Sequence, residues 1–293
     1  MPNNKSTTAN QLKLALPKGR MERGVNQLFL DAGVRITSGN RAYRPTFSLG
    51  GFDVKVLKPQ NIVEMLDIGS RDIGFAGADW VKELGADVVE ILDTELDPVR
   101  LVAAAPASLL IEGRLPRRAL LVVSEYERVV REWLNAGGIE ARVVRSYGAT
   151  EVFPPEDADF IVDVAATGAT LAANGLIVFE EILRSSTRLY ASRAAWNDAT
   201  KRTAIEDLIM VLRSVLEARR RVMLEVNVSR ERMEAIVNAL PCMRAPTVSP
   251  LAGDGSFAVK SAVLRDLLPS LIPKLKALGG SDIVVSPLAQ VVP

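Results

Sequence analysis

Residues 160–171, with the sequence FIVDVAATGATL, contain the change from strand to helix that decides the fold. The apolar run Phe160–Val164 predicts a buried strand with one acidic residue, Asp163, near its carboxyl end. A turn of small residues and the start of a helix follow it. The segment Thr167–Thr170 can present successive backbone N–H groups and two hydroxyls at a helix N-terminus, an arrangement that suits a phosphate dianion.

The chemistry of this turn favours a sugar phosphate as its ligand. Gly168 lets phosphate oxygens approach the main chain, and each charge-assisted hydrogen bond would contribute about 1.5–3 kcal/mol. Asp163 can accept hydrogen bonds from ribose hydroxyls. The alternative is an ordinary Thr N-cap with Gly in the turn. The sequence has neither a Walker A loop here nor G-x-G-x-x-G anywhere, so a dinucleotide oxidoreductase loses its main support.

Outward from this segment, the first two-thirds of the chain alternates between strand and helix patterns. This alternation predicts a mainly parallel sheet covered on both faces. The expected strands are 12–16, 52–57, 73–76, 88–92, 100–105, 119–123, 141–145 and 160–164, and the expected helices are 22–32, 60–68 and 125–136.

The last third of the chain has a different pattern. A long helix with one apolar face is expected over residues 198–221. It is followed by strand, helix, strand, strand, helix and strand, at 222–228, 231–240, 247–251, 257–263, 264–278 and 283–286. This is the ferredoxin-like order, and it predicts a separate C-terminal domain.

Composition excludes several kinds of chemistry. The 293 residues include no histidine, so Ser-His-Asp and Cys-His catalysis, histidine-ligated metals and an imidazole proton shuttle are excluded. One cysteine, Cys242, cannot form an internal disulfide or a zinc cluster. The net charge of +1 gives no excess positive field, so we expect neither nucleic acid nor a membrane as partner.

Length and targeting signals narrow the class of protein further. A chain that is 48% hydrophobic can bury a sizeable core, and its length suggests two or three domains. The longest apolar stretch, Leu101–Ile111, is interrupted by Pro106 and is too short to span a bilayer. The polar start, Met1–Gln11, lacks the apolar segment of a signal peptide. We therefore expect a cytoplasmic protein.

A second junction of strand and helix carries positive charge. Lys18 and Arg20 bracket Gly19 just before a predicted helix, where two cations, backbone amides and the helix dipole suit a pyrophosphate or triphosphate. The alternative is a basic surface turn. Arg41, Arg44 and Lys58 could reach the same cleft, or they could be solvated surface charges.

Two further acidic residues lie where a predicted strand or turn passes into a helix. Asp79 follows the buried strand that ends in Gly77, so we expect it to be a helix N-cap, with lining of a nucleotide cleft as a second role. Glu151 follows the segment Gly148–Thr150 and is expected to face the helix dipole, with substrate contact as the alternative.

Taken together, these segments resemble the ATP phosphoribosyltransferase family in its long form. The resemblance rests on motifs in the same order and at compatible separations from residue 12 to residue 287. They are Leu14–Arg20, Asp72–Trp80, Asp163 to Leu176, Ala245–Gly253 and Lys274–Gly279. The single acid in Val162-Asp163-Val164 differs from the two adjacent acids that are usual in type I phosphoribosyltransferases, which disfavours purine-salvage and pyrimidine enzymes.

The resemblance implies an α/β fold with a two-lobed catalytic region similar to type II periplasmic-binding proteins, and a C-terminal ferredoxin-like regulatory domain. The lobes would be residues 12–95 with 184–220, and residues 96–183, and the regulatory domain would be 221–293. The reaction would be attack of adenine N1 of ATP on C1′ of phosphoribosyl pyrophosphate, which gives phosphoribosyl-ATP and pyrophosphate as the first step of histidine biosynthesis.

The resemblance also implies partners and roles for single residues. Mg²⁺ would bind mainly through substrate phosphates, histidine would inhibit, and the chain would form a homo-oligomer, from dimer to hexamer. Catalytic roles fall to Lys18, Arg20 and Glu151, and substrate binding falls to Gly19, Lys58, Asp79, Asp163, Thr167, Gly168, Ala169 and Thr170. The allosteric candidates are Asn227, Thr247 and Asp282.

This reaction suits a chain without histidine. Adenine N1 already has a lone pair, so no strong base must generate the nucleophile, and positioned charges can stabilise the departing pyrophosphate. The alternative is a non-catalytic small-molecule-binding protein, because solute receptors share the two-lobed fold and a fold does not by itself define a function.

Overall fold

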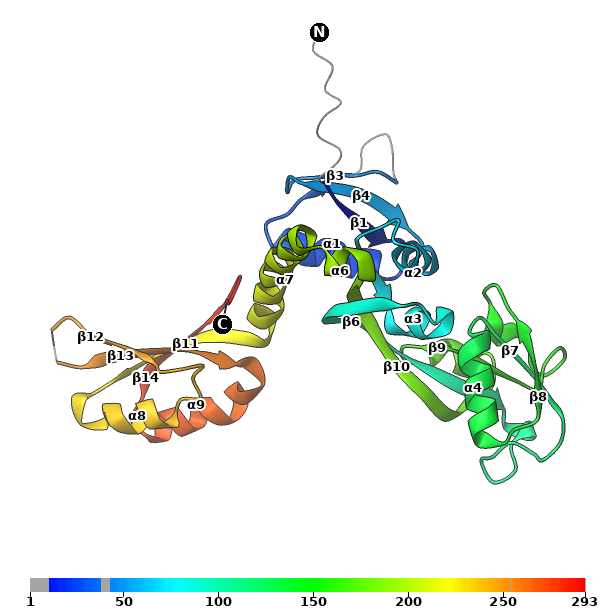
Figure 1. The fold of residues 1–293 in the computed structure, drawn as a ribbon. Coiled ribbons are helices and arrows are strands. Elements are labelled where there is room, and N and C mark those ends of the chain that lie inside the picture. The colour runs from blue at the N-terminus through cyan, green and yellow to red at the C-terminus, as the bar shows by residue number, and fades with distance from the viewer. Residues whose placement is uncertain (1–10, 38–42, 254, 293) are drawn as a thin grey trace, which may run out of the picture. The chain divides into compact units, whose positions relative to one another are not determined.

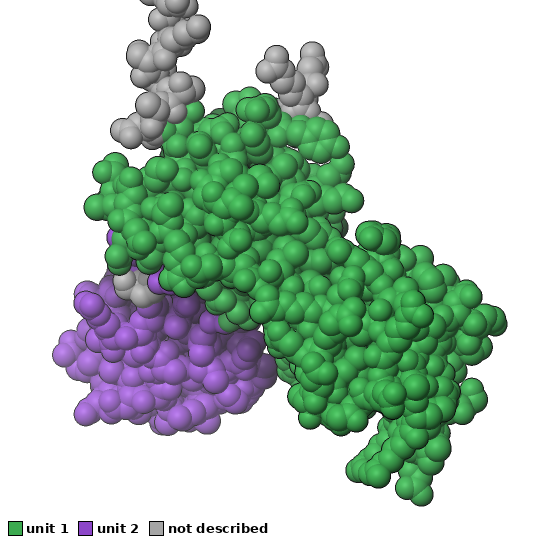
Figure 2. Space-filling model, turned by 45° about the vertical axis from the view of Figure 1, so that its right-hand side comes forward, with its two compact units in different colours: residues 1–27, 35–205 green, residues 28–34, 206–293 purple. Residues whose placement is uncertain are grey.

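A computed structural model describes residues 11–37, 43–253 and 255–292 (Figure 1). The chain forms two compact units, which are described separately below (Figure 2). Unit 1 comprises residues 1–27 and 35–205, and unit 2 comprises residues 28–34 and 206–293. Among the helices of the described ranges, none is long and apolar enough to cross a membrane.

Unit 1 is built on a mixed sheet whose described strands have the order β4-β1-β5-β10-β6-β9-β7-β8. They are β1 (Leu12–Pro17), β4 (Phe52–Leu57), β5 (Ile73–Gly77), β6 (Val88–Pro106), β7 (Leu120–Ser124), β8 (Ala141–Arg145), β9 (Phe160–Ala165) and β10 (Leu176–Ser192). The groups β4-β1-β5 and β9-β7-β8 are parallel, whereas β10 and β6 join them by antiparallel pairing. The expected mainly parallel sheet is thus corrected: it is parallel only at its two ends.

Two long strands explain that difference. The strands expected at 88–92 and 100–105 are one strand, β6, and its partner β10 was not predicted. The apolar alternation of β6 is broken because Glu95 and Asp97 lie in the left-handed region, with φ of 57° and 47°. Beside them the pairing with β10 shifts register between Ser185 and Arg188. The two long strands therefore connect the parallel groups: β10 pairs with β5, β6 pairs with β9, and the two strands pair with each other. Their mutual pairing is irregular between the groups.

The helices of unit 1 cover the sheet and agree closely with the sequence pattern. Apolar side chains from helix and sheet, such as Ile62, Leu66, Val122 and Phe160, are fully buried in one core. The helices are α2 (Pro59–Asp67), α3 (Ala78–Leu84), α4 (Glu127–Gly137), α5 (Ala169–Ala173) and α6 (Arg193–Asn197), while α1 (Glu22–Asp31) and α7 (Ala199–Arg220) belong in part to unit 2. Short pieces are β2 (Ile36–Thr37), β3 (Thr46–Phe47), η1 (Ala107–Leu109) and η2 (Thr150–Val152).

Unit 2 contains the predicted ferredoxin-like domain. Its elements are β11 (Arg221–Val228), η3 (Arg230–Arg232), α8 (Met233–Ala239), β12 (Thr247–Pro250), β13 (Phe257–Leu264), η4 (Arg265–Leu267), α9 (Leu268–Ala277) and β14 (Ser281–Pro287). The strand order β12-β13-β11-β14 is that of a βαββαβ unit. Alternate residues of β11, including Leu224 and Val226, are buried with Ile236 and Leu275 of the two helices, so one face of the sheet forms the core.

Candidate active site

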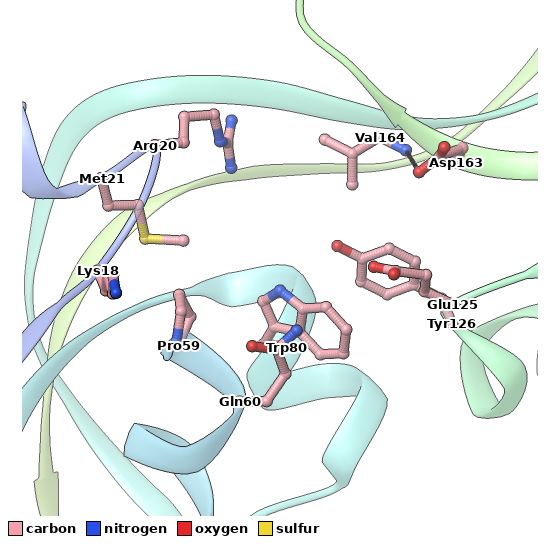
Figure 3. Close-up of a pocket in the computed structure, with 10 residues that line it drawn as sticks. All are labelled: Lys18, Arg20, Met21, Pro59, Gln60, Trp80, Glu125, Tyr126, Asp163 and Val164. Carbon is pink, nitrogen blue, oxygen red and sulfur yellow. Dashed lines mark hydrogen bonds between the residues drawn. The ribbon is translucent and has the colours of Figure 1, made fainter. Parts of the chain in front are cut away.

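A pocket of about 210 Å³ in unit 1 gathers residues from distant parts of the sequence (Figure 3). Its lining consists of Lys18, Arg20, Met21, Pro59, Gln60, Trp80, Glu125, Tyr126, Asp163 and Val164. Most of these residues lie at or just beyond the carboxyl ends of strands, where ligands of α/β sheets commonly bind. In Figure 3 the cations lie on one side of the pocket and the carboxyl groups on the other.

The basic turn after β1 forms the cationic side of the pocket. Gly19 has a φ of 86°, which a residue with a side chain rarely adopts, and its N–H donates to Glu22 Oε2 at 3.3 Å. The Lys18 Nζ donates to the Tyr43 hydroxyl at 3.1 Å, and Arg20 Nη1 donates to the Asp97 carbonyl at 3.3 Å. Lys18 and Arg20 therefore both line the pocket. Gly19 shapes the turn between them but does not line the pocket.

Asp163, near the carboxyl end of β9, provides negative charge on the opposite side. Burial, together with the nearby charges of Glu125 and Glu151, raises the pKa of its carboxyl group from 3.8 to about 6, although hydrogen bonds from the Val164 N–H and from Thr150 act in the opposite direction. The Val164 N–H donates to Asp163 Oδ1 at 2.6 Å. The hydrogen bonds to Asp163 do not offset the cost of burying its negative charge. Any hydrogen-bond donor or cation that enters the pocket would therefore stabilise the ionised carboxylate.

The predicted phosphate loop follows Val164 directly. Gly168 has a φ of 78° and is the N-cap of α5, and the Ala169 N–H donates to Thr167 Oγ1 at 3.3 Å. The side chains of Thr167 and Thr170 are exposed, and no atom lies within 4 Å of where a Cβ of Gly168 would be. The loop is thus open to a ligand, although its residues are not part of the pocket lining.

Two other predicted residues lie beside the pocket without lining it. Glu151 is half-buried in η2, and it acts on the pocket through its charge, which raises the pKa of Asp163. Lys58 is exposed at the N-cap position of α2, next to Pro59 in the lining. Arg44 does not line the pocket, and its Nη1 lies 3.9 Å from Asp53 Oδ1. Arg41 falls outside the described residues.

The structure buries Asp79 behind the pocket wall. Gly77 is the N-cap of α3, so the expected N-cap role of Asp79 is wrong: it belongs to the first turn of the helix. Both of its carboxylate oxygens accept hydrogen bonds, from the Tyr126 hydroxyl and from Ser185 Oγ, each at 2.7 Å. Contact between Asp79 and a substrate stays a prediction.

Several lining residues were not predicted. Trp80 and Tyr126 form an aromatic pair with ring centroids 4.7 Å apart, and Glu125 lies beside them at the end of β7. Burial, followed by the charge of Asp79, raises the pKa of the Tyr126 hydroxyl, which stays protonated and donates to that carboxylate. The position of Glu125 and Tyr126 directly after a predicted parallel strand was the signal that could have identified them.

The three allosteric candidates are all in unit 2. The Asn227 amide donates to Asp282 Oδ2 at 3.3 Å, so these two side chains are in contact. Thr247 is on β12, which is separated from β11 by β13, and it pairs with Lys260. The structure therefore brings two of the candidates together and leaves the third two strands away.

The carboxyl groups of the pocket are possible ligands for a magnesium ion. In the part of the chain that the structure describes, no group of three His, Cys, Asp or Glu side chains could hold a metal ion by itself. Glu125 and Asp163, however, both present carboxyl groups to the pocket, and carboxylate oxygens are the donors that Mg²⁺ prefers. The electrostatic repulsion between these two groups would be relieved by a divalent cation, so the residues fit a metal that arrives with most of its ligands on a substrate.

The fold and the pocket define a mixed α/β protein with a charged pocket in unit 1 and a βαββαβ domain in unit 2. Comparison with known proteins identifies its family. The family model described as "ATP phosphoribosyltransferase" matches residues 58–214, and the model described as "HisG, C-terminal domain" matches residues 218–290.

The same family accounts for the relatives and for a solved structure. Proteins named ATP phosphoribosyltransferase from Pelotomaculum thermopropionicum and Chlorobium phaeobacteroides are 37% and 35% identical to this chain, covering 97% and 94% of it and 100% and 95% of the relatives. A structure titled "ATP phosphoribosyl transferase (HisG:HisZ) complex from Thermotoga maritima" matches with a TM-score of 0.63 and 25% identity, covering 71% of this chain and 99% of that one.

The chain belongs to the ATP phosphoribosyltransferase family. It is an enzyme, a pentosyltransferase of the first step of histidine biosynthesis. The match to the C-terminal family domain fits the predicted long form. These matches give no support to the alternative of a non-catalytic binding protein.

Proposed function

We propose that the pocket between the Lys18–Arg20 turn and Asp163 is where ATP attacks phosphoribosyl pyrophosphate. The observation that carries this proposal is the opposition of charges across the pocket: two cations from the turn after β1 face two carboxyl groups from the ends of β7 and β9. The cations suit phosphate groups, and the carboxyl groups suit sugar hydroxyls and a positively charged adenine.

The donor sugar would be held by the segment from Asp163 to Thr170. The open N–H groups around Gly168 would bind the 5′-phosphate, together with the hydroxyls of Thr167 and Thr170. Asp163 would accept hydrogen bonds from the ribose hydroxyls, since its carboxylate is poorly compensated without a ligand. This arrangement leaves C1′ and the pyrophosphate facing the cationic side of the pocket.

Charge stabilisation and alignment would provide the catalysis. Adenine N1 attacks C1′ with inversion, the C1′–O bond to pyrophosphate breaks, and the bonding electrons leave with the pyrophosphate. Lys18 and Arg20 would stabilise that developing negative charge. Alignment of two bound reactants can lower a barrier by about 7–11 kcal/mol. The adenine becomes cationic and loses a proton from N6, to water or to a carboxylate, for which Glu151 and Glu125 are the candidates.

Magnesium is proposed as a companion of phosphoribosyl pyrophosphate. When bound, it would neutralise negative charge on the pyrophosphate. Glu125 and Asp163 are the residues that would face the metal or its water ligands, because both line the pocket.

The remaining expectations concern organisation and regulation. We propose lobes of residues 12–95 with 184–220 and of residues 96–183, a division supported by the irregular pairing of β6 and β10 near Leu96 and Ser185. Inhibition by histidine at the domain of residues 221–293, assembly into dimers or hexamers, and a cytoplasmic location are proposed from the family resemblance. Asn227 and Asp282, which are in contact, are the first positions to test for the histidine site.

The test mixes the purified protein with ATP, Mg²⁺ and phosphoribosyl pyrophosphate and follows ultraviolet absorbance and pyrophosphate release, with and without histidine. We expect transfer, and we expect Lys18→Ala to lower kcat/KM by about tenfold or more because it removes a cation from the leaving group. Lys13→Ala is the matched control, since Lys13 is an exposed lysine of β1, the strand that ends just before Lys18, and it lies outside the pocket. Equal activity of both variants would contradict the assigned role of Lys18.

A further inference from the structure

A buried polar network holds the aromatic wall of the pocket, and the proposed reaction does not use it. Asp79, Tyr126 and Ser185 are 1%, 3% and 5% exposed. The Asp79 carboxylate accepts hydrogen bonds from both hydroxyls at 2.7 Å, and the Asp79 N–H donates to Ser185 Oγ at 3.1 Å. Because a buried carboxylate needs such donors, these three groups are strongly constrained to one arrangement.

One turn further along α3, a second carboxylate binds the N-terminus of α4. Glu83 accepts hydrogen bonds from the N–H groups of Arg128 and Val129, at 3.1 and 3.0 Å. The first N–H groups of a helix have no partner within it, and the N-cap residue of α4, Tyr126, provides no side-chain cap. Glu83 therefore supplies, from another helix, the cap that α4 lacks.

Two more contacts join the same pair of helices. The indole ring of Trp80, on α3, packs against the ring of Tyr126. At the end of α3, Gly85 has a φ of 60°, and the guanidinium of Arg128 occupies the space that a Cβ at this position would need. Thus every turn of α3 contacts the N-terminal end of α4, and Asp79 and Glu83 make the two polar connections.

These helices belong to opposite halves of the unit 1 sheet. Helix α3 follows β5, which pairs with β1 and β10, whereas α4 follows β7, which pairs with β8 and β9. The halves also share one apolar core, and they are joined by β6 and β10, whose pairing shifts register between Ser185 and Arg188. Glu95 and Asp97, in the left-handed region, lie on the facing stretch of β6. Irregular pairing at this joint resists bending less than a continuous ladder does.

The pocket lies between groups on the two sides of this joint, so bending there would change its width. The cationic turn belongs to the half with β1, and Arg20 donates to the Asp97 carbonyl at the joint itself. Asp163 belongs to the half with β9. The Ser185 hydroxyl, which lies at the register shift, donates a hydrogen bond to the Asp79 carboxylate. Contacts that tie α3 to α4 therefore also set the separation between the two charged sides of the pocket.

We propose that Asp79 and Glu83 are positioning residues, which clamp α4 to α3 and thereby align the two substrate-binding halves of the pocket. The catalytic consequence rests on the proposed function. Asp79 acts through Tyr126 and Ser185, and Glu83 acts through the N-terminus of α4. The 5′-phosphate and ribose would be held in one half, and the departing pyrophosphate would face the cations of the other, so loss of the clamp should lower kcat more than it weakens the binding of either substrate.

The first experiment separates alignment from binding. Tyr126→Phe removes one hydroxyl and keeps the ring that packs on Trp80, and Glu83→Ala removes the cap of α4 at a half-buried position. We expect each variant to lower kcat about tenfold, with dissociation constants for ATP and for phosphoribosyl pyrophosphate changed by less than about threefold in calorimetry. Glu83→Gln keeps only one of the two acceptor oxygens, so its activity should fall between those of the parent and Glu83→Ala.

The control is Glu132→Gln, which removes an exposed ion pair of α4 with the Arg128 side chain and leaves the hydrogen bonds of Asp79 and Glu83 in place. It should match the parent enzyme. A kcat within about twofold of the parent in both Tyr126→Phe and Glu83→Ala would overturn the proposal, and so would an equal loss in the Glu132→Gln control.

The second experiment does not depend on catalysis. Spin labels are placed at Ile68→Cys, a 69% exposed position after α2, and at Arg142→Cys, an exposed position of β8, in a Cys242→Ala background. Pulsed electron resonance then measures the distance distribution between the two halves. We expect a narrow distribution in the parent and a broader or shifted one in Glu83→Ala and Tyr126→Phe.

The two experiments distinguish failure of this proposal from failure of the proposed function. An unchanged distance distribution in the clamp variants overturns the clamp, whatever the activity. A parent protein that transfers no phosphoribosyl group, but whose distances broaden in the variants, retains the clamp and refutes the reaction assigned to the pocket.

Discussion

Replacement of Asp163 by Asn removes the charge of the half-buried carboxyl group in the pocket while preserving its shape. Burial, with a contribution from the charges of Glu125 and Glu151, raises the pKa of that group from 3.8 to about 6. A shift of about two units, at about 1.4 kcal/mol each, means that the ionised form costs the folded ligand-free protein roughly 3 kcal/mol at neutral pH. The Asn Oδ1 can still accept the Val164 N–H, so the variant should be more stable than the parent.

The size of this effect depends on pH. The folded state holds the Asp163 proton more tightly than the unfolded state does, so the parent is relatively stable below the unfolded pKa and loses this stability as pH rises through about 6. The advantage of Asp163→Asn should therefore be small near pH 4 and reach its full size above pH 7. With about 2–4 °C per kcal/mol, the melting temperature of the ligand-free variant should be several degrees higher at pH 8.

The assay is calorimetric or denaturant unfolding of ligand-free protein between pH 4 and 8. Asp159→Asn is a control of opposite sign, because the Arg118 guanidinium at 2.6 Å and the Leu121 N–H hold the pKa of Asp159 below its usual value. That variant should lose stability at neutral pH. If Asp163→Asn were no more stable than the parent at pH 8, or equally stabilised at pH 4, the electrostatic reasoning would be refuted.

Three further predictions concern the ligands of the enzyme. Asp163→Ala should weaken binding of phosphoribosyl pyrophosphate more than binding of ATP in calorimetry, and equal effects on both would argue against contact with the ribose. Gly168→Val should abolish donor binding with the fold intact by circular dichroism, because a β-branched residue at a φ of 78° costs about 1–3 kcal/mol and reshapes the loop, and unchanged affinity would refute the phosphate site. A folded chain that ends near Arg221 should lose inhibition by histidine in the pyrophosphate-release assay, and persistent inhibition would place the effector site elsewhere.

Local sequence signals identified most elements and residues on both charged sides of the pocket. The strand before Asp163 and the glycine of the following turn were visible in the sequence because apolar runs and small residues reflect local backbone preferences. The Lys18–Arg20 turn was visible for the same reason. The ferredoxin-like order of unit 2 also followed from the sequence, since the alternation of apolar residues in strands such as β11 is a pattern of neighbouring positions.

The strand β10 and the pocket wall were not predictable in the same way. Residues Glu180 to Ser186 of β10 are mostly polar, and the strand forms because β5 and β6 supply hydrogen-bonding partners on either side. Asp79 shows the limit most clearly, because its position suggested an N-cap. Its burial and its bond to Tyr126, 47 positions away in the sequence, depend on how α3 meets α4.

The sequence by itself determined the order of elements, the two loops that suit phosphate, the absence of imidazole chemistry and the βαββαβ pattern of the last seventy residues. The tertiary structure alone decided that Lys18 faces Asp163, that β6 and β10 link two parallel groups of strands, and that Asp79 supports the pocket from behind. The physical reason is the distance along the chain over which each effect acts. Backbone preference and hydrophobic periodicity act between neighbouring residues. The opposition of charges, burial and side-chain hydrogen bonds depend on residues that only folding brings together.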